Sequence, residues 1–215
     1  LRPLIKLDSM KATMKTLSAI LICCFISTIQ MYGENIQRPE SENYVKGVEA
    51  LNEGNPEAAY TYLNAEINEH PDNGYAHCYM ALICNFCNDT KLALQALNSS
   101  LELIPEADTE YRSFAHYSRG VLLSNLKMWE RAEADLNEAI RLNPEDVENY
   151  KSRAQLYFET ERYEESLDDL TRALKLDSKA DVNDLMLQLM AVAPTSDYVE
   201  RITATYQQLD QVTIH

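Results

Sequence analysis

Residues 147–180 read VENYKSRAQLYFETERYEESLDDLTRALKLDSKA, and this stretch decides the fold. Its apolar and small residues recur at helical spacing, which predicts two helices in succession that end near Ser178. Working back along the chain, Pro144 lies 34 residues before Ser178, Pro105 a further 39 and Pro71 a further 34. Proline lacks an N–H, so it can stop one helix and shape the entry to the next. The sequence therefore predicts that a two-helix segment occurs four times.

The same residue types return at the same places in each predicted repeat. The repeats are residues 40–73, 74–107, 113–146 and 147–180, with a five-residue insertion at 108–112. Counting from the start of each repeat, position 8 is small and position 24 is leucine. The residues at position 8 are Gly47, Ala81, Gly120 and Ala154, and those at position 24 are Leu63, Leu97, Leu136 and Leu170. Small residues at position 8 let two antiparallel helices approach closely, and the leucines fill the space between neighbours.

This pattern resembles the tetratricopeptide repeat family. The fourth repeat carries it most fully, in Tyr150, Ala154, Tyr157, Tyr163, Ser166, Leu170 and Ala173. The first repeat departs from the family pattern at Pro56 and Glu66, and the second departs at Thr90. The resemblance implies an all-α fold, an α-solenoid in which helix-turn-helix pairs stack into a right-handed superhelix. Each pair of such an array buries its apolar face only against its neighbours.

Residues 181–215 are expected to close the array as a capping helix pair. The first helix is predicted from Asp181 to Ala193, before Pro194, and the second after Asp197. Their apolar stripes are Val182, Leu185, Met186, Leu189 and Met190, then Val199, Ile202, Tyr206, Leu209 and Val212. A surface for pairing with a second copy is the alternative to a simple end cap.

Residues 1–33 are predicted to be an export segment whose true start is Met14. Lysines precede an apolar run at residues 17–29, which has the length of a secretory signal. A membrane-spanning helix needs about 20 apolar residues, so the run is short for one. An uncleaved N-terminal anchor, or a lipid on one of the cysteines at 23–24, is the alternative.

The charge excludes some classes of partner. The 215 residues carry 34 acidic and 19 basic side chains, a formal charge of −15. Residues 34–215 alone hold 33 acidic and 15 basic residues, which gives −18. Nucleic acids and anionic membranes require a positive face, so neither is expected as a partner. With 46% apolar residues, the chain has enough material for a folded core.

The resemblance places a ligand groove on the concave face, along the first helix of each repeat. The candidate groove residues are Tyr44, Tyr75, Cys78, Asn85, Phe86, Phe114, Tyr117, Asn125, Lys151 and Gln155. Aromatic side chains with amides suit a peptide ligand, because they offer contact area and hydrogen bonds together. The lysines and asparagines with which some family members clamp chaperone C-termini are absent from the matching positions.

Cys84 and Cys87 form a C-x-x-C pair, which invites a redox interpretation. A redox cysteine normally lies at a helix N-terminus, where the helix dipole lowers its pKa. Cys84 is predicted late in its helix and Cys87 at the bend that follows, so structural packing is favoured. A disulfide between the two after export is the alternative.

The sequence as a whole predicts a non-enzymatic scaffold or adaptor that binds a peptide segment of a partner protein in its groove. No catalytic motif, metal site or cofactor is expected. A thiol–disulfide or envelope-assembly component, tethered to a membrane, is the alternative function. The expected location is outside the cytoplasm, either periplasmic or secreted, with N-terminal anchoring as the alternative.

Overall fold

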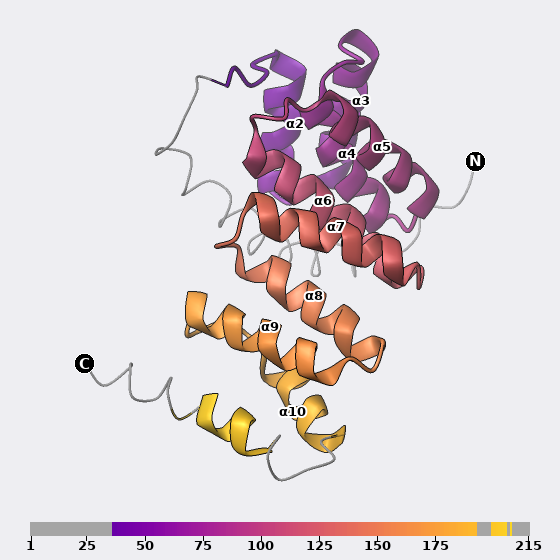
Figure 1. Cartoon of the computed structure of the whole chain (residues 1–215). Helices are drawn as coiled ribbons and strands as arrows, with labels where there is room; N and C mark the ends of the chain where they lie inside the picture. Colours follow the sequence, from indigo (N-terminus) through magenta and orange to yellow (C-terminus); the bar gives the residue numbers. More distant parts are fainter. Residues whose placement is uncertain (1–35, 193–198, 206, 208–215) are drawn as a thin grey trace. The chain divides into compact units, whose positions relative to one another are not determined.

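The computed structural model describes residues 36–192, 199–205 and 207. Within these residues all regular secondary structure is α-helical (Figure 1), so the predicted all-α fold class is confirmed. The predicted export segment lies outside the described residues. None of the described helices is both long enough and apolar enough for a bilayer span.

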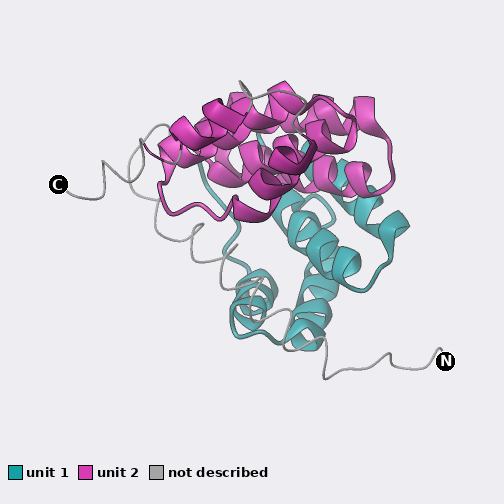
Figure 2. Ribbon diagram, turned by 90° about the horizontal axis from the view of Figure 1, so that it is seen from below, with its two compact units in different colours: residues 1–108 teal, residues 109–215 magenta. Residues whose placement is uncertain are grey.

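The chain divides into two compact units, Leu1–Asp108 and Thr109–His215 (Figure 2). The helices of unit 1 are α2 (Glu42–Asn52), α3 (Pro56–Glu69), α4 (Gly74–Phe86) and α5 (Thr90–Leu103). In this unit α2 packs on α3, α3 on α4, and α4 on α5. Consecutive helices are therefore neighbours in space, as in a stack of hairpins.

Unit 2 follows the same plan. Its helices are α6 (Thr109–Asn125), α7 (Trp129–Leu142), α8 (Val147–Glu159), α9 (Tyr163–Leu176) and α10 (Asn183–Val192). Each helix packs on the next one along the chain, and residues 199–205 are helical as well. The structure begins α10 two residues later than the sequence predicted, at Asn183.

Polar residues before several helices explain where those helices begin. The side-chain oxygens of Asn55, Asn73 and Asp89 each accept a hydrogen bond from the backbone N–H three residues ahead, at 3.1–3.2 Å. Asp146 accepts one from Glu148 at 2.9 Å. These caps satisfy N–H groups that have no partner within the helix.

The turn inside each hairpin uses one left-handed residue at the same repeat position. These residues are Gly54, Asn88, Lys127 and Glu161, with φ of 71°, 58°, 58° and 62°. All four occupy position 15. Glycine adopts this conformation without steric cost, whereas lysine and glutamate do not. The backbone geometry is therefore conserved among the four hairpins although the residue type is not.

Position 8 lies against position 24 within the first and third hairpins, which specifies where the predicted close approach occurs. A Cβ atom added at Gly47 would come within 2.7 Å of Leu63 Cγ, and one at Gly120 within 2.8 Å of Leu136 Cγ. Such distances are shorter than van der Waals contact, so the helices cross too closely for a larger residue to fit without movement. The prediction of a close approach at this position is confirmed.

A second contact inside the hairpins joins positions 7 and 23 in the first, third and fourth repeats, whereas both positions are apolar in the second repeat. The pairs are Lys46 with Tyr62, Met80 with Ala96, Arg119 with Asp135, and Arg153 with Asp169. The Lys46 ammonium lies 5.8 Å from the centroid of the Tyr62 ring. Arg119 donates two hydrogen bonds to Asp135 at 2.7 and 2.8 Å, and Arg153 donates two to Asp169 at 2.7 Å. Met80 and Ala96 are both buried.

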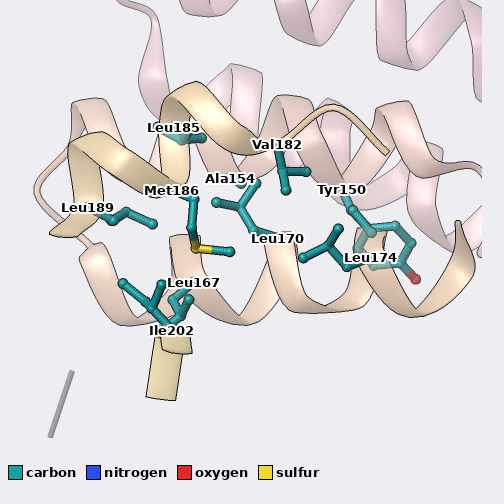
Figure 3. Packing of buried hydrophobic residues seen from close by; sticks show 11 residues of the cluster. Tyr150, Ala154, Leu167, Leu170, Leu174, Val182, Leu185, Met186, Leu189 and Ile202 are labelled. Atoms are coloured by element: carbon teal, nitrogen blue, oxygen red, sulfur yellow. The ribbon is translucent and has the colours of Figure 1, made fainter. Parts of the chain in front are cut away.

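The end of unit 2 contains an apolar cluster between α8, α9 and α10 (Figure 3). Val182, Leu185, Met186 and Leu189 contribute to it from α10 and its approach, and Ile202 contributes from residues 199–205. Met190 and Val199, predicted to belong to the apolar stripes, are instead 37% exposed. Their helices meet the core with narrower faces than the sequence suggested, and the predicted residues Tyr206, Leu209 and Val212 lie outside the described side chains.

Candidate binding surface

Three of the candidate groove residues in unit 1 have buried side chains. Tyr44, Tyr75 and Cys78 are 7%, 4% and 0% exposed, so they pack inside the unit. Asn85 is exposed and Phe86 is partly buried in the last turn of α4. The accessible part of the candidate surface in unit 1 is therefore confined to the end of that helix.

Tyr75 also has a defined structural partner. Its hydroxyl donates a hydrogen bond to Asp108 Oδ2 at 3.0 Å, and Arg38 donates two more to the same carboxylate at 3.1 and 3.2 Å. The Asp108 side chain is only 1% exposed. The segment before α2 is thus fastened to the first residue of the insertion at 108–112.

In unit 2 the candidate residues are more accessible. Asn125 and Gln155 are exposed, whereas Phe114, Tyr117 and Lys151 are partly buried. The rings of Phe114 and Tyr117 stack, with centroids 6.4 Å apart and an interplanar angle of 23°. Burial raises the pKa of Tyr117 to about 12, so its phenol is neutral at physiological pH. Unit 2 therefore presents aromatic and amide groups along α6 and α8.

A pocket of about 200 Å³ lies beside α8, α9 and α10 of unit 2. Three buried apolar residues form its floor, namely Leu170, Val182 and Leu185. More accessible polar residues form its rim, and these are Lys151, Gln155, Asp181, Asp184 and Gln188. Figure 3 shows Val182 pointing toward Leu170 from the approach to α10.

Two of the rim residues were predicted as groove residues and have partners on their own helix. Lys151 Nζ donates to Glu148 Oε1 at 2.8 Å, and Gln155 Nε2 donates to Glu159 Oε1 at 2.8 Å. The acidic rim residues Asp181 and Asp184 were not predicted. They precede or begin α10, which the sequence analysis treated only as a cap, so no pattern in the sequence linked them to α8.

The three described cysteines are free thiols. Burial raises the pKa of Cys78 to about 12 and that of Cys84 to about 11, and the charge of Asp89 adds to the second shift. Cys87 is exposed, and burial together with Asp89 raises its pKa as well. Because the thiolate is the reactive form, these shifts disfavour the thiol–disulfide alternative. Among the described residues no group of three or more His, Cys, Asp or Glu is arranged to hold a metal ion.

Parts of this chain match known proteins in sequence and in fold. Residues 113–146 and residues 148–179 each match a family model described as a tetratricopeptide repeat. Among solved structures, MamA residues 41 to the end from Desulfovibrio magneticus RS-1 has a TM-score of 0.63 at 19% identity, covering 79% of this chain and 94% of that one. YrrB, described as a TPR protein with an unusual peptide-binding site, has a TM-score of 0.55 at 22% identity, covering 69% and 72%.

Two curated proteins are similar in sequence. Human tetratricopeptide repeat protein 6 is 24% identical over 143 residues, which are 66% of this chain and 26% of that protein. The lipoprotein NlpI homolog of Haemophilus influenzae is 31% identical over 87 residues, 40% of this chain and 28% of that protein. The chain thus spans about a quarter of the length of each.

The fold defines a helical-repeat protein of the α-solenoid class. The repeat itself is the tetratricopeptide repeat, and this chain carries it at residues 113–146 and 148–179.

Proposed function

We propose that this chain is a non-enzymatic interaction module that holds a segment of a partner protein against the first helices of its repeats. The observation that carries the proposal is the surface of α6 and α8, where the exposed amides of Asn125 and Gln155 accompany partly buried aromatic rings, and where α8 also lines the pocket beside α10. Such a mixture supplies contact area together with hydrogen bonds, as peptide-binding surfaces do. The likeness to YrrB, described as having a peptide-binding site, supports the same proposal.

The proposed contact surface is narrower than the full set of candidate residues. Tyr44, Tyr75 and Cys78 are buried, so a partner would reach Asn85 and Phe86 in unit 1. In unit 2 it would reach Asn125 and Gln155, together with parts of Phe114, Tyr117 and Lys151. Amides in these places can hydrogen-bond the backbone of an extended segment without selecting one particular sequence.

The test is selection of binding segments from a displayed peptide library, followed by affinity measurement on variants. We expect Asn125→Ala and Gln155→Ala each to lower the affinity for the selected peptides about three- to tenfold. Each substitution removes one hydrogen-bonding group that contributes about 0.5–1.5 kcal/mol. The matched controls are Asn64→Ala on α3 and Gln95→Ala on α5. Both are exposed, on second helices of their repeats.

The proposal predicts unchanged affinity in the two control variants. Equal affinity in all four variants would show that peptides bind elsewhere, and a library that yields no binding segment would also contradict the proposal.

We also propose that the protein is exported and works outside the cytoplasm. The basic and apolar run before residue 33 supports this location, as does the similarity to a protein named as a lipoprotein. Cell fractionation and the intact mass of the purified protein test it. Export requires a fraction outside the cytoplasm, whose N-terminus is removed for a cleaved signal and retained or lipidated for an anchor, whereas cytosolic protein that retains residue 14 contradicts it.

A further inference from the structure

We propose that the pocket beside α8, α9 and α10 receives the side chain of a lysine or arginine from the partner segment. This inference rests on the proposed function and names the chemistry of the residue that the segment inserts. It follows from the size of the pocket, from its apolar floor and from the charge of its rim.

The size of the pocket fits one side chain. Pockets that enclose small-molecule ligands measure about 300–1,000 Å³. The pocket here measures about 200 Å³ and opens between exposed polar residues. Its floor of Leu170, Val182 and Leu185 offers apolar contact at the bottom only. A long side chain with an apolar stem and a polar tip matches this layout.

The charge of the pocket rim favours a side chain with a positively charged end. The carboxylates of Asp181 and Asp184 are exposed, and within the described part of the chain neither makes a hydrogen bond or an ion pair. The lysine of the rim, Lys151, donates to Glu148 at 2.8 Å, so its charge is already matched. A cation entering the pocket would meet two available carboxylates, whereas a carboxylate tip would be repelled by both.

Binding of single-residue probes tests the pocket without requiring a known partner. The probes are N-acetyl-lysine methylamide and N-acetyl-arginine methylamide, titrated into isotope-labelled protein at low salt and followed by two-dimensional NMR. We expect the backbone amides of residues 181–188 to shift with both probes. N-acetyl-norleucine methylamide, which has an apolar side chain only, is expected to shift them at least about tenfold more weakly, because it lacks the charge.

Two double variants separate the pocket from the general acidity of the chain. The double variant Asp181→Asn with Asp184→Asn is expected to lower the affinity for the lysine probe about tenfold. Glu130→Gln with Glu145→Gln changes the net charge equally at exposed positions outside the pocket and is expected to leave the affinity unchanged. Equal weakening in both variants, equal binding of norleucine, or no shift at residues 181–188 would overturn the inference.

The peptide library and the lysine probe together distinguish failure of the pocket inference from failure of the proposed function. If library peptides bind and depend on Asn125, but the lysine probe does not shift residues 181–188, only the pocket inference is wrong. If the lysine probe binds at those residues and the library yields no binding segment, the proposed function is wrong, and only the selectivity of the pocket for a cationic side chain stands.

Discussion

Asp135 and Asp169 occupy the same repeat position and accept paired hydrogen bonds from an arginine, yet their pKa values move in opposite directions. At Asp169, burial outweighs the bonds from Arg153 and raises the pKa. At Asp135, burial also acts to raise it, but the combined bonds from Arg119 and His116 prevail and lower the pKa. His116 Nδ1 lies 2.9 Å from Asp135 Oδ1, a contact that Asp169 lacks, while the charge of Asp168 adds to the rise at Asp169.

Removing the imidazole is therefore expected to raise the pKa of Asp135. In wild-type protein the lowered pKa contributes stability above the ordinary value of about 3.9, and this contribution is lost as pH falls through the folded-state pKa. His116→Ala should shrink the contribution and weaken this part of the acid dependence of unfolding. Carboxyl titration by carbon-13 NMR measures both aspartates, with Asp169 as the internal control. An unchanged pKa for Asp135 would show that Arg119 alone sets it.

At the scale of the elements, the left-handed residues in the hairpin turns are strained, so replacing one with glycine is expected to stabilise the fold. Glu161 has φ of 62°, where a side chain is strained and glycine is not. Glu161→Gly is expected to raise the free energy of unfolding by about 0.5–1 kcal/mol, as relief of strain exceeds the added freedom of the unfolded chain. The matched change Glu49→Gly, at an exposed site inside α2, should lower it by about 1 kcal/mol.

Chemical denaturation followed by circular dichroism measures both variants. A loss of stability in Glu161→Gly as large as that in Glu49→Gly would mean that the turn at position 15 carries no strain.

The helices and their closest crossings could be predicted from the sequence, because they depend on short-range periodicity and residue size. Gly47 and Gly120 recur at the spacing that a close crossing requires, whereas their particular contacts with Leu63 and Leu136 emerged only from the structure. The left-handed turns could not be predicted at Lys127 and Glu161, since neither residue favours that conformation. There the geometry of two packed helices determines the backbone, whatever residue occupies the turn.

On the scale of the whole molecule, stability in a repeat array depends on contacts between neighbours, so the end of the array needs a cover. Leu189 on α10 is 0% exposed and belongs to the cluster with Leu167 and Leu170, whereas the adjacent Met190 is 37% exposed. Leu189→Ala should lower the free energy of unfolding by about 2–5 kcal/mol through the cavity that it leaves. Met190→Ala should lower it by less than about 1 kcal/mol.

Thermal and urea unfolding of the two variants checks this expectation, and comparable losses would mean that α10 does not cover α9 through Leu189.

The same long-range packing limits what the sequence could predict about the candidate site. Lys151 and Gln155 were identified from their repeat positions, but the pocket also needs Asp181 and Asp184. The apolar stripe predicted that α10 caps the preceding pair, but which of its polar side chains come to line a pocket with α8 depends on long-range packing.

The unlike pairs at positions 7 and 23 have a consequence for how the chain avoids misfolding. Hairpins of similar length and sequence could exchange partners during folding, with the first helix of one repeat closing on the second helix of another. If α4 closed on α7, Met80 would lie against Asp135, and a buried carboxylate without its cation costs about 3–5 kcal/mol. If α6 closed on α5, the Arg119 guanidinium would lie against Ala96 at a similar penalty. The charged pair of the third repeat and the apolar pair of the second thus disfavour closure of either repeat on the other's helices.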